Sequence, residues 1–161
     1  MTALEVMPRY EAYKDSGVEW LGNIPCAWGI SRLKYLASIK TGEKDTIHRV
    51  DDGEFPFFIR SPKVQRIDTF SYHGEAVLTA GDGDIGRIFH YINGKFDYHQ
   101  RVYKFSNFRK ISGKYLYYYL HHNLAEEVIK LSAKTTVDSL RLPFLQNFPV
   151  VLPSLNEQTD I

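Results

Sequence analysis

The chain has 161 residues, of which 43% are hydrophobic and 24% are charged. These proportions are typical of a folded globular domain, and they exclude the disordered, collagen-like and disulfide-stapled classes. The formal net charge of +1 does not by itself indicate a nucleic-acid partner, and the sequence has no apolar run long enough to span a membrane.

The N-terminal third predicts little regular structure. Residues 1–15 show no sustained period and are expected to form an arm, whereas residues 16–153 are expected to form a single domain. Cys26 is the only cysteine, so we expect a small buried side chain in a reducing, cytoplasmic protein. Residues 30–39 mix strand and helix spacings, which leaves their type open, and the polar stretch 40–54 indicates an exposed loop.

Strands dominate the middle of the chain. Residues 55–59 and 75–80 predict two short buried strands, with the polar loop 60–71 between them. Asn93-Gly94 then suits the positive φ angles of a type I′ turn. This signal predicts a long hairpin over residues 87–105 that turns at Asn93-Gly94.

The C-terminal third predicts a helix, a strand and the start of a second helix. Ser112 suits an N-cap position and apolar residues recur at helical spacing, so residues 113–131 predict one helix or two abutting ones. Residues 148–152 predict a strand, and residues 154–161 open with a capping-box spacing that indicates the start of a helix. The order of elements predicts an α/β protein of the α+β type, with a mixed twisted sheet, the long hairpin and segregated helices.

A glycine motif in the middle of the chain tests the possibility of a cofactor. Gly81, Gly83 and Gly86 have dinucleotide-binding spacing, but a strand is expected to follow them, and Asp82 and Asp84 would repel phosphate. A tight turn is the better interpretation. No histidine or cysteine spacing suits zinc and no nucleophile is marked for acyl transfer, so we expect no cofactor, metal or catalytic residue. A small metal-dependent nuclease that uses the two aspartates and a nearby lysine stays open as an alternative.

Basic and polar side chains are concentrated in three stretches. Arginine and glutamine have forked donor groups that match guanine and adenine edges, so residues 60–66 are suited to reading bases. Residues 99–101 interrupt the alternation of the second hairpin strand and are expected to present polar side chains to a partner. Residues 134–136 combine one cation with two hydroxyls, which suits phosphate. Each stretch, taken alone, is also open to interpretation as a solvated loop.

Several segments carry a resemblance through their order and spacing over nearly the whole chain. They are residues 13–25 with Trp28, 81–86 leading to 99–103, 115–120, 139–141, and 148–153 leading into Glu157-Gln158. Together they resemble the target-recognition domain of the specificity subunit of type I restriction-modification enzymes.

The resemblance implies a division of labour among subunits. In that family the specificity subunit selects double-stranded DNA, methylation (M) subunits carry adenine methylation, and restriction (R) subunits carry ATP-driven translocation and cleavage. The implied role is therefore a non-catalytic reader of one half of a bipartite site. A full subunit of the family has two recognition domains held apart by long helices, so a chain that covers one domain is expected to be a fragment or half-subunit. A protein-interaction module remains open as the second reading.

The resemblance also separates two kinds of DNA contact. Segments that recur among members with different targets are implied to position the DNA backbone; these are His99, Gln100, Arg101, Lys134, Thr135 and Thr136. The loops 44–49 and 60–66 are less like the family and are expected to read bases. The base-reading candidates are Lys44, Arg49, Arg60, Lys63, Gln65 and Arg66, with Arg60 and Arg66 as first choices.

Overall fold

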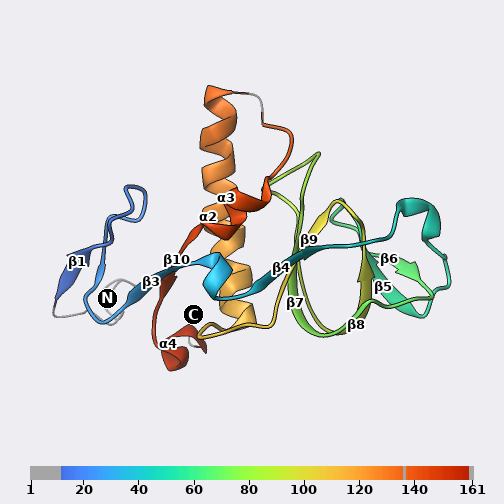
Figure 1. Cartoon of the computed structure of the whole chain (residues 1–161), viewed down its shortest axis with the longest axis horizontal. Helices are drawn as coiled ribbons and strands as arrows, with labels where there is room; N and C mark the ends of the chain where they lie inside the picture. Colours follow the sequence, from blue (N-terminus) through green and yellow to red (C-terminus); the bar gives the residue numbers. More distant parts are fainter. Residues whose placement is uncertain (1–11, 136, 160–161) are drawn as a thin grey trace, which may run out of the picture.

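The chain builds a six-stranded sheet against one long helix, as the computed structural model shows for residues 12–135 and 137–159 (Figure 1). The predicted arm 1–15 lies mostly outside the described residues. The strands in chain order are β1 (Tyr13–Asp15), β2 (Asn23–Pro25), β3 (Gly29–Arg32), β4 (Ser38–Thr41), β5 (Phe55–Phe58), β6 (Gln65–Ile67), β7 (Tyr72–Ala80), β8 (Phe89–Tyr98), β9 (Val102–Ser106) and β10 (Pro149–Leu152). The helices are η1 (Leu33–Tyr35), η2 (Thr46–His48), α2 (Gly113–Lys134), α3 (Leu142–Gln146) and α4 (Leu155–Thr159).

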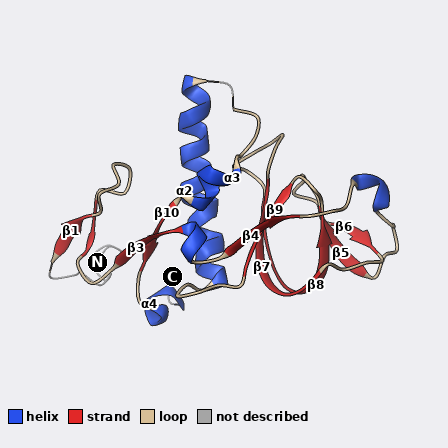
Figure 2. Cartoon of the chain, viewed as in Figure 1, coloured by secondary structure: helices blue, strands red, loops and turns tan. Residues whose placement is uncertain are grey.

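The main sheet has the strand order β4-β9-β7-β8-β5-β6. Only β5 and β8 pair in parallel, and the other neighbours are antiparallel. Figure 2 shows that the sheet curls strongly beside α2, while β3 and β10 form a separate pair on the other side of the helix. The mixed sheet with segregated helices that the sequence predicts is therefore confirmed.

A long hairpin is present, but it joins β7 to β8 and is not the hairpin predicted over residues 87–105. β7 and β8 pair from Tyr72↔Phe96 to Thr79↔Phe89, so the chain turns between residues 80 and 89. Asn93-Gly94 lies inside β8, and Gly94 lacks the positive φ angle that a type I′ turn requires. Pairing of β8 with β7 on one edge and with β5 on the other outweighs the local turn preference of two residues.

The helix α2 covers one face of the sheet. Its cap is confirmed, since Ser112 Oγ accepts a hydrogen bond from the backbone N–H of Tyr115 at 3.2 Å. The fully buried Leu116 and Leu120 belong to the same apolar core as Val77 of β7. Strand side chains alternate between faces. The neighbours of Val77 accordingly face a second apolar cluster on the opposite side of the sheet, formed by Phe58, Ala76, Leu78, Phe96, Tyr98 and Val102.

The predicted strands at 55–59, 75–80 and 148–152 are confirmed as β5, β7 and β10. The loops expected at 40–54 and 60–71 contain η2 and β6, which are too short to produce a periodic signal. Cys26 is exposed, so the expectation of a buried cysteine is wrong.

The two ends of the described chain add little to the core. A short helix, α4, lies where the sequence predicts the start of a helix, and residues 160–161 lie outside the described range. Among the helices of the described residues, none has the length and apolarity needed to cross a membrane.

Candidate functional site

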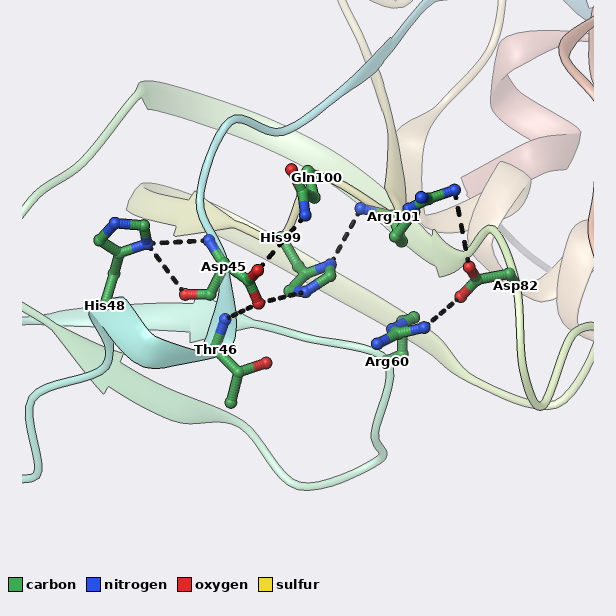
Figure 3. Close-up of polar contacts among 8 residues, drawn as sticks. All are labelled: Asp45, Thr46, His48, Arg60, Asp82, His99, Gln100 and Arg101. Atoms are coloured by element: carbon green, nitrogen blue, oxygen red, sulfur yellow. Dashed lines mark hydrogen bonds and ion pairs between the residues drawn. The ribbon is translucent and has the colours of Figure 1, made fainter.

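Polar side chains from four separate segments meet beside the end of β8, and Figure 3 shows how they face one another. We call six of these residues the polar cluster: Asp45, Arg60, Asp82, His99, Gln100 and Arg101. Two of the segments follow β4 and β5, and the other two are the turns after β7 and β8. The cluster brings together one predicted base-reading residue and three predicted positioning residues.

Main-chain hydrogen bonds hold these segments together, and the turn 99–101 is their centre. The backbone N–H of His99 donates to Phe58 at the end of β5, and the carbonyl of Arg101 accepts from Gly81 at 2.7 Å. Lys44 and Gly42, after β4, bond to the same turn, since Gln100 N–H donates to Lys44 and Gly42 N–H donates to His99. The turn after β7 in turn bonds to residues 138–140, through Gly83 N–H to Asp138 and Leu140 N–H to Gly81.

One carboxylate lies between two arginines in the cluster. Arg60 Nη1 donates to Asp82 Oδ1 at 2.6 Å, and Arg101 Nη1 lies 3.9 Å from Asp82 Oδ2. The side chains of Arg60 and Arg101 are 42% and 64% exposed. Exposed ion pairs contribute little stability, about 0–1 kcal/mol. The contacts therefore act mainly to orient two guanidinium groups, and one positive charge of the trio stays uncompensated.

His99 is an internal connector, which corrects the expectation that it presents its side chain to a partner. The side chain is only 2% exposed. Nδ1 accepts a hydrogen bond from the backbone N–H of Arg101 at 2.9 Å, and Nε2 lies 3.4 Å from Asp45 Oδ1, within ion-pair distance but without hydrogen-bond geometry. The interrupted alternation of apolar residues indicates that the His99 side chain faces a partner, but only the fold shows that the ring is enclosed. Gln100 and Arg101, by contrast, are exposed.

Burial of His99 and a main-chain hydrogen bond to Asp45 set the charge states of these two side chains. Burial lowers the pKa of His99 below its usual range, the nearby Arg60 guanidinium acts in the same direction, and Asp45 opposes both. The backbone N–H of Thr46, which donates to Asp45 Oδ1 at 2.6 Å, is the main cause that lowers the pKa of Asp45. At neutral pH the cluster therefore contains a neutral imidazole next to a charged carboxylate.

The His99 environment predicts a pH-dependent stability. Above an unfolded-state pKa of about 6.5, both the folded and unfolded states hold a neutral ring, so the stabilisation is complete. Below the unfolded-state pKa the unfolded state binds a proton on His99 while the folded state does not. Stability therefore decreases as the pH falls, until it passes the lower folded-state pKa. We expect urea midpoints to decrease between about pH 7.5 and about pH 5, and to decrease less in the His99→Gln variant. His90, whose pKa burial also lowers, should supply the residual slope in that variant. An equal pH dependence in wild type and His99→Gln would contradict the assignment.

Lys44 lies next to the cluster through its main-chain bond with Gln100, whereas the other four predicted base-reading residues lie apart from it. Arg49, Lys63, Gln65 and Arg66 line a small pocket of about 210 Å³ beside β6. The Arg66 guanidinium donates to two backbone carbonyls, from Nε to Gly53 at 3.0 Å and from Nη2 to Glu54 at 2.8 Å. Two of its donor groups thus hold the turn before β5, so the structure favours Arg60 over Arg66 as a reading residue.

The predicted phosphate-binding stretch lies at the end of α2. Lys134 is the last helical residue, Thr135 is the C-cap, and Thr136 lies outside the described residues. The chain then returns to the cluster and borders a groove of about 460 Å³ whose lining includes Gln100, Arg101 and Arg141. Arg141 is exposed and was not among the predicted site residues, although it belongs to a family-like segment.

The carboxylates of the alternative nuclease site are paired with arginines. Asp82 contacts Arg60 and Arg101, and Asp84 Oδ1 lies 3.6 Å from Arg87 Nε. Within the described residues, no group of three or more His, Cys, Asp or Glu side chains is arranged to hold a metal ion. The arginines and polar side chains of the cluster are suited to recognition of a partner through positive charge and hydrogen bonds.

Comparison with known sequences places this geometry in context. Residues 25–161 match the family model described as type I restriction modification DNA specificity domain. The chain is 31% identical over 138 residues to the type I restriction enzyme EcoDI specificity subunit of Escherichia coli, an alignment that covers 86% of this chain and 30% of that protein.

Solved structures show the same fold. The S subunit of a type I restriction-modification system from M. genitalium is similar with a TM-score of 0.68 and 21% identity, over 83% of this chain and 36% of that one. The HsdS subunit from Thermoanaerobacter tengcongensis is similar with a TM-score of 0.64 and 19% identity, over 92% of this chain and 38% of that one. The chain thus spans about a third of the length of each of these relatives.

Proposed function

The chain belongs to the family of type I restriction-modification DNA specificity domains, and we propose that it is a target-recognition domain that reads one half of a bipartite site in double-stranded DNA. The observation that carries this proposal is the polar cluster, in which Arg60 and Arg101 are oriented by a single carboxylate at an exposed edge of the sheet. Oriented guanidinium groups suit both base edges and phosphates.

The two arginines have different roles in this proposal. Arg60 uses Nη1 to contact Asp82, and no contact with another described residue engages its Nε and Nη2. A guanidinium held at one corner in this way presents a fixed pair of donors, which suits the O6 and N7 acceptors of guanine. Arg101 is more exposed and farther from Asp82, so it is suited to a backbone phosphate. The proposed contacts with the DNA backbone are completed by Gln100, Lys134, Thr135 and Thr136. The proposed outer reading surface consists of Lys44, Arg49, Lys63 and Gln65.

The proposed partners follow from family membership. As a specificity component, the domain has no catalytic role of its own. It directs the methylation subunit, and through the assembled complex the restriction subunit, to its DNA site in the cytoplasm. Residues 16–153 form the proposed recognition domain, and residues 154–161 are the proposed start of a long helix of the kind that separates recognition domains in the family.

A chimaeric specificity subunit tests the proposal. Residues 25–161 replace the matching segment of the EcoDI specificity subunit, the chimaera is expressed with the EcoDI methylation and restriction subunits, and methylated adenines are mapped in host DNA. We expect one half of the methylated site to change, while the other half and the number of base pairs between the two halves stay the same. The matched control is unmodified EcoDI specificity subunit in the same strain.

Two results would count against the proposal. Methylation at the original EcoDI site would show that the inserted segment does not read DNA. A folded chimaera that assembles with its partners but leaves DNA unmethylated, together with duplex binding that does not respond to salt, would favour a protein-interaction module, because phosphate contacts make DNA affinity fall steeply with salt.

A further inference from the structure

A second polar site lies along β4 and β9, away from the arginines of the polar cluster. It is a pocket of about 640 Å³ whose lining includes Lys40, Glu43, Tyr72, Tyr98 and Lys104. Three serines also line it: Ser38, Ser71 and Ser106. The lining thus combines cations, hydroxyl groups and aromatic rings, and the candidate site residues described above do not use it.

Lys104 is the unusual member of this pocket. The residue is only 6% exposed, yet it carries an ammonium group with three N–H donors. Its Nζ lies 3.6 Å from the ring centroid of Tyr72 and 5.5 Å from that of Tyr98. Among the described residues no carboxylate or carbonyl accepts a hydrogen bond from it. Aromatic faces replace only part of the hydration that a buried ammonium loses.

Lys40 increases this imbalance of charge. It lies directly opposite Lys104 in the antiparallel pairing of β4 with β9, so both side chains belong to the same face of the sheet. Like charges directly opposite each other destabilise a sheet. Burial lowers the pKa of Lys104 to about 8, and Lys40 acts in the same direction. Glu43 is the one acidic residue in the lining, so the pocket keeps one positive charge in excess.

We propose that this pocket binds a phosphate group, with Lys104 and Lys40 as its cationic contacts and Ser38 and Ser106, which lie opposite each other in β4 and β9, as hydroxyl donors. A single negative charge matches the excess positive charge of the lining, and a phosphodiester carries that charge. Tyr98 retains its phenolic proton at neutral pH, because burial raises its pKa to about 12, so its hydroxyl is available as a donor. A pocket of this volume admits a phosphate that belongs to a larger molecule, either the DNA backbone or a small phosphorylated compound.

Inorganic phosphate tests the site directly. Backbone amide resonances of the purified chain are followed by NMR during a phosphate titration at constant ionic strength. We expect saturable shifts at Ser71, Tyr72 and Ser106, and affinity reduced roughly tenfold in Lys104→Met, as for loss of one charged hydrogen-bonding group. Methionine retains the apolar contact with the tyrosine rings. Lys95→Met is the matched control, since Lys95 Nζ lies 5.0 Å from the Phe70 ring centroid but outside the pocket.

A second variant, at an exposed residue, controls for the possibility that Lys104→Met does not fold. Lys40→Gln changes a surface side chain and should weaken phosphate binding several-fold without affecting the fold. The proposal is overturned if phosphate produces no saturable shift at the pocket, or if Lys104→Met and Lys40→Gln both bind it as wild type does.

Duplex binding identifies the source of the phosphate. If the pocket holds a DNA phosphate, the salt dependence of duplex affinity should decrease by about one contact in Lys104→Met. If the slope is unchanged while inorganic phosphate still binds, a small phosphorylated molecule is the ligand. Because the phosphate titration requires no DNA, failure of the DNA-reading proposal and failure of this one give different results.

Discussion

Replacing Gly42 with alanine should reduce the free energy of unfolding by roughly 3 kcal/mol, at the upper end of the usual cost of overpacking. An added Cβ would overlap the carbonyl oxygen of Tyr98 and would lie 2.7 Å from that of His99. Both are main-chain atoms at the end of β8, where Gly42 N–H donates to the His99 carbonyl. The clash can be relieved only if the segment after β4 separates from the turn 99–101.

Urea denaturation of the variant and of Gly94→Ala measures the effect. Gly94 lies inside β8 of the same sheet, but no atom lies within 4 Å of an added Cβ there. Alanine in a strand interior is favoured over glycine by roughly 0.5–1 kcal/mol, so Gly94→Ala should be neutral or stabilising. Equal stability of the two variants would show that the segment after β4 does not approach the turn 99–101 as described.

Replacing Arg60 with alanine should relax recognition at one base pair of the target. A bidentate arginine contact discriminates against the wrong base by about 1–3 kcal/mol, or roughly 5- to 150-fold. The measurement compares binding to the duplex identified by methylation mapping with binding to duplexes changed at single positions. The variant should bind the original duplex more weakly than wild type does. It should bind the duplex changed at the base pair that Arg60 reads with an affinity similar to that for the original duplex.

Arg101→Ala provides the contrast within the same cluster. Both arginines contact Asp82, so each variant removes one of the two cationic partners of that carboxylate. Arg101→Ala should weaken binding to all duplexes alike and reduce the salt slope by about one, as expected for a phosphate contact. If the two variants lower affinity uniformly, Arg60 does not read a base.

Much of the fold was predictable because its signals are local. The apolar runs of β5, β7 and β10 and the helical spacing in α2 each lie within one element, and Ser112 caps the helix that its position suggests. The misplaced hairpin turn has the opposite origin. Asn93-Gly94 is a good local turn, but β8 has partners on both edges that the sequence does not reveal.

The candidate site was predictable only in part. Arginine chemistry directed attention to Arg60, and the family-like segment to residues 99–101, yet nothing in the sequence joins them. The joining residues are Asp45 and Asp82, which look like ordinary loop acids until the fold places them beside His99 and two arginines. Similarly, the guanidinium of Arg66 is a plausible reader until its two carbonyl partners are known.

The atoms that hold the turn 99–101 to its neighbouring segments belong mainly to the backbone. Gly42, Lys44, Phe58 and Gly81 all bond to it through main-chain N–H or carbonyl groups, which every residue except proline supplies in the same form. With the exception of Gly42, where an added Cβ would clash with the main chain, side chains in the loops after β4 and β5 can therefore diverge during evolution without loss of these attachments. Selection for new specificities can act through successive point mutations at exposed loop positions, while the architecture that presents them is inherited intact.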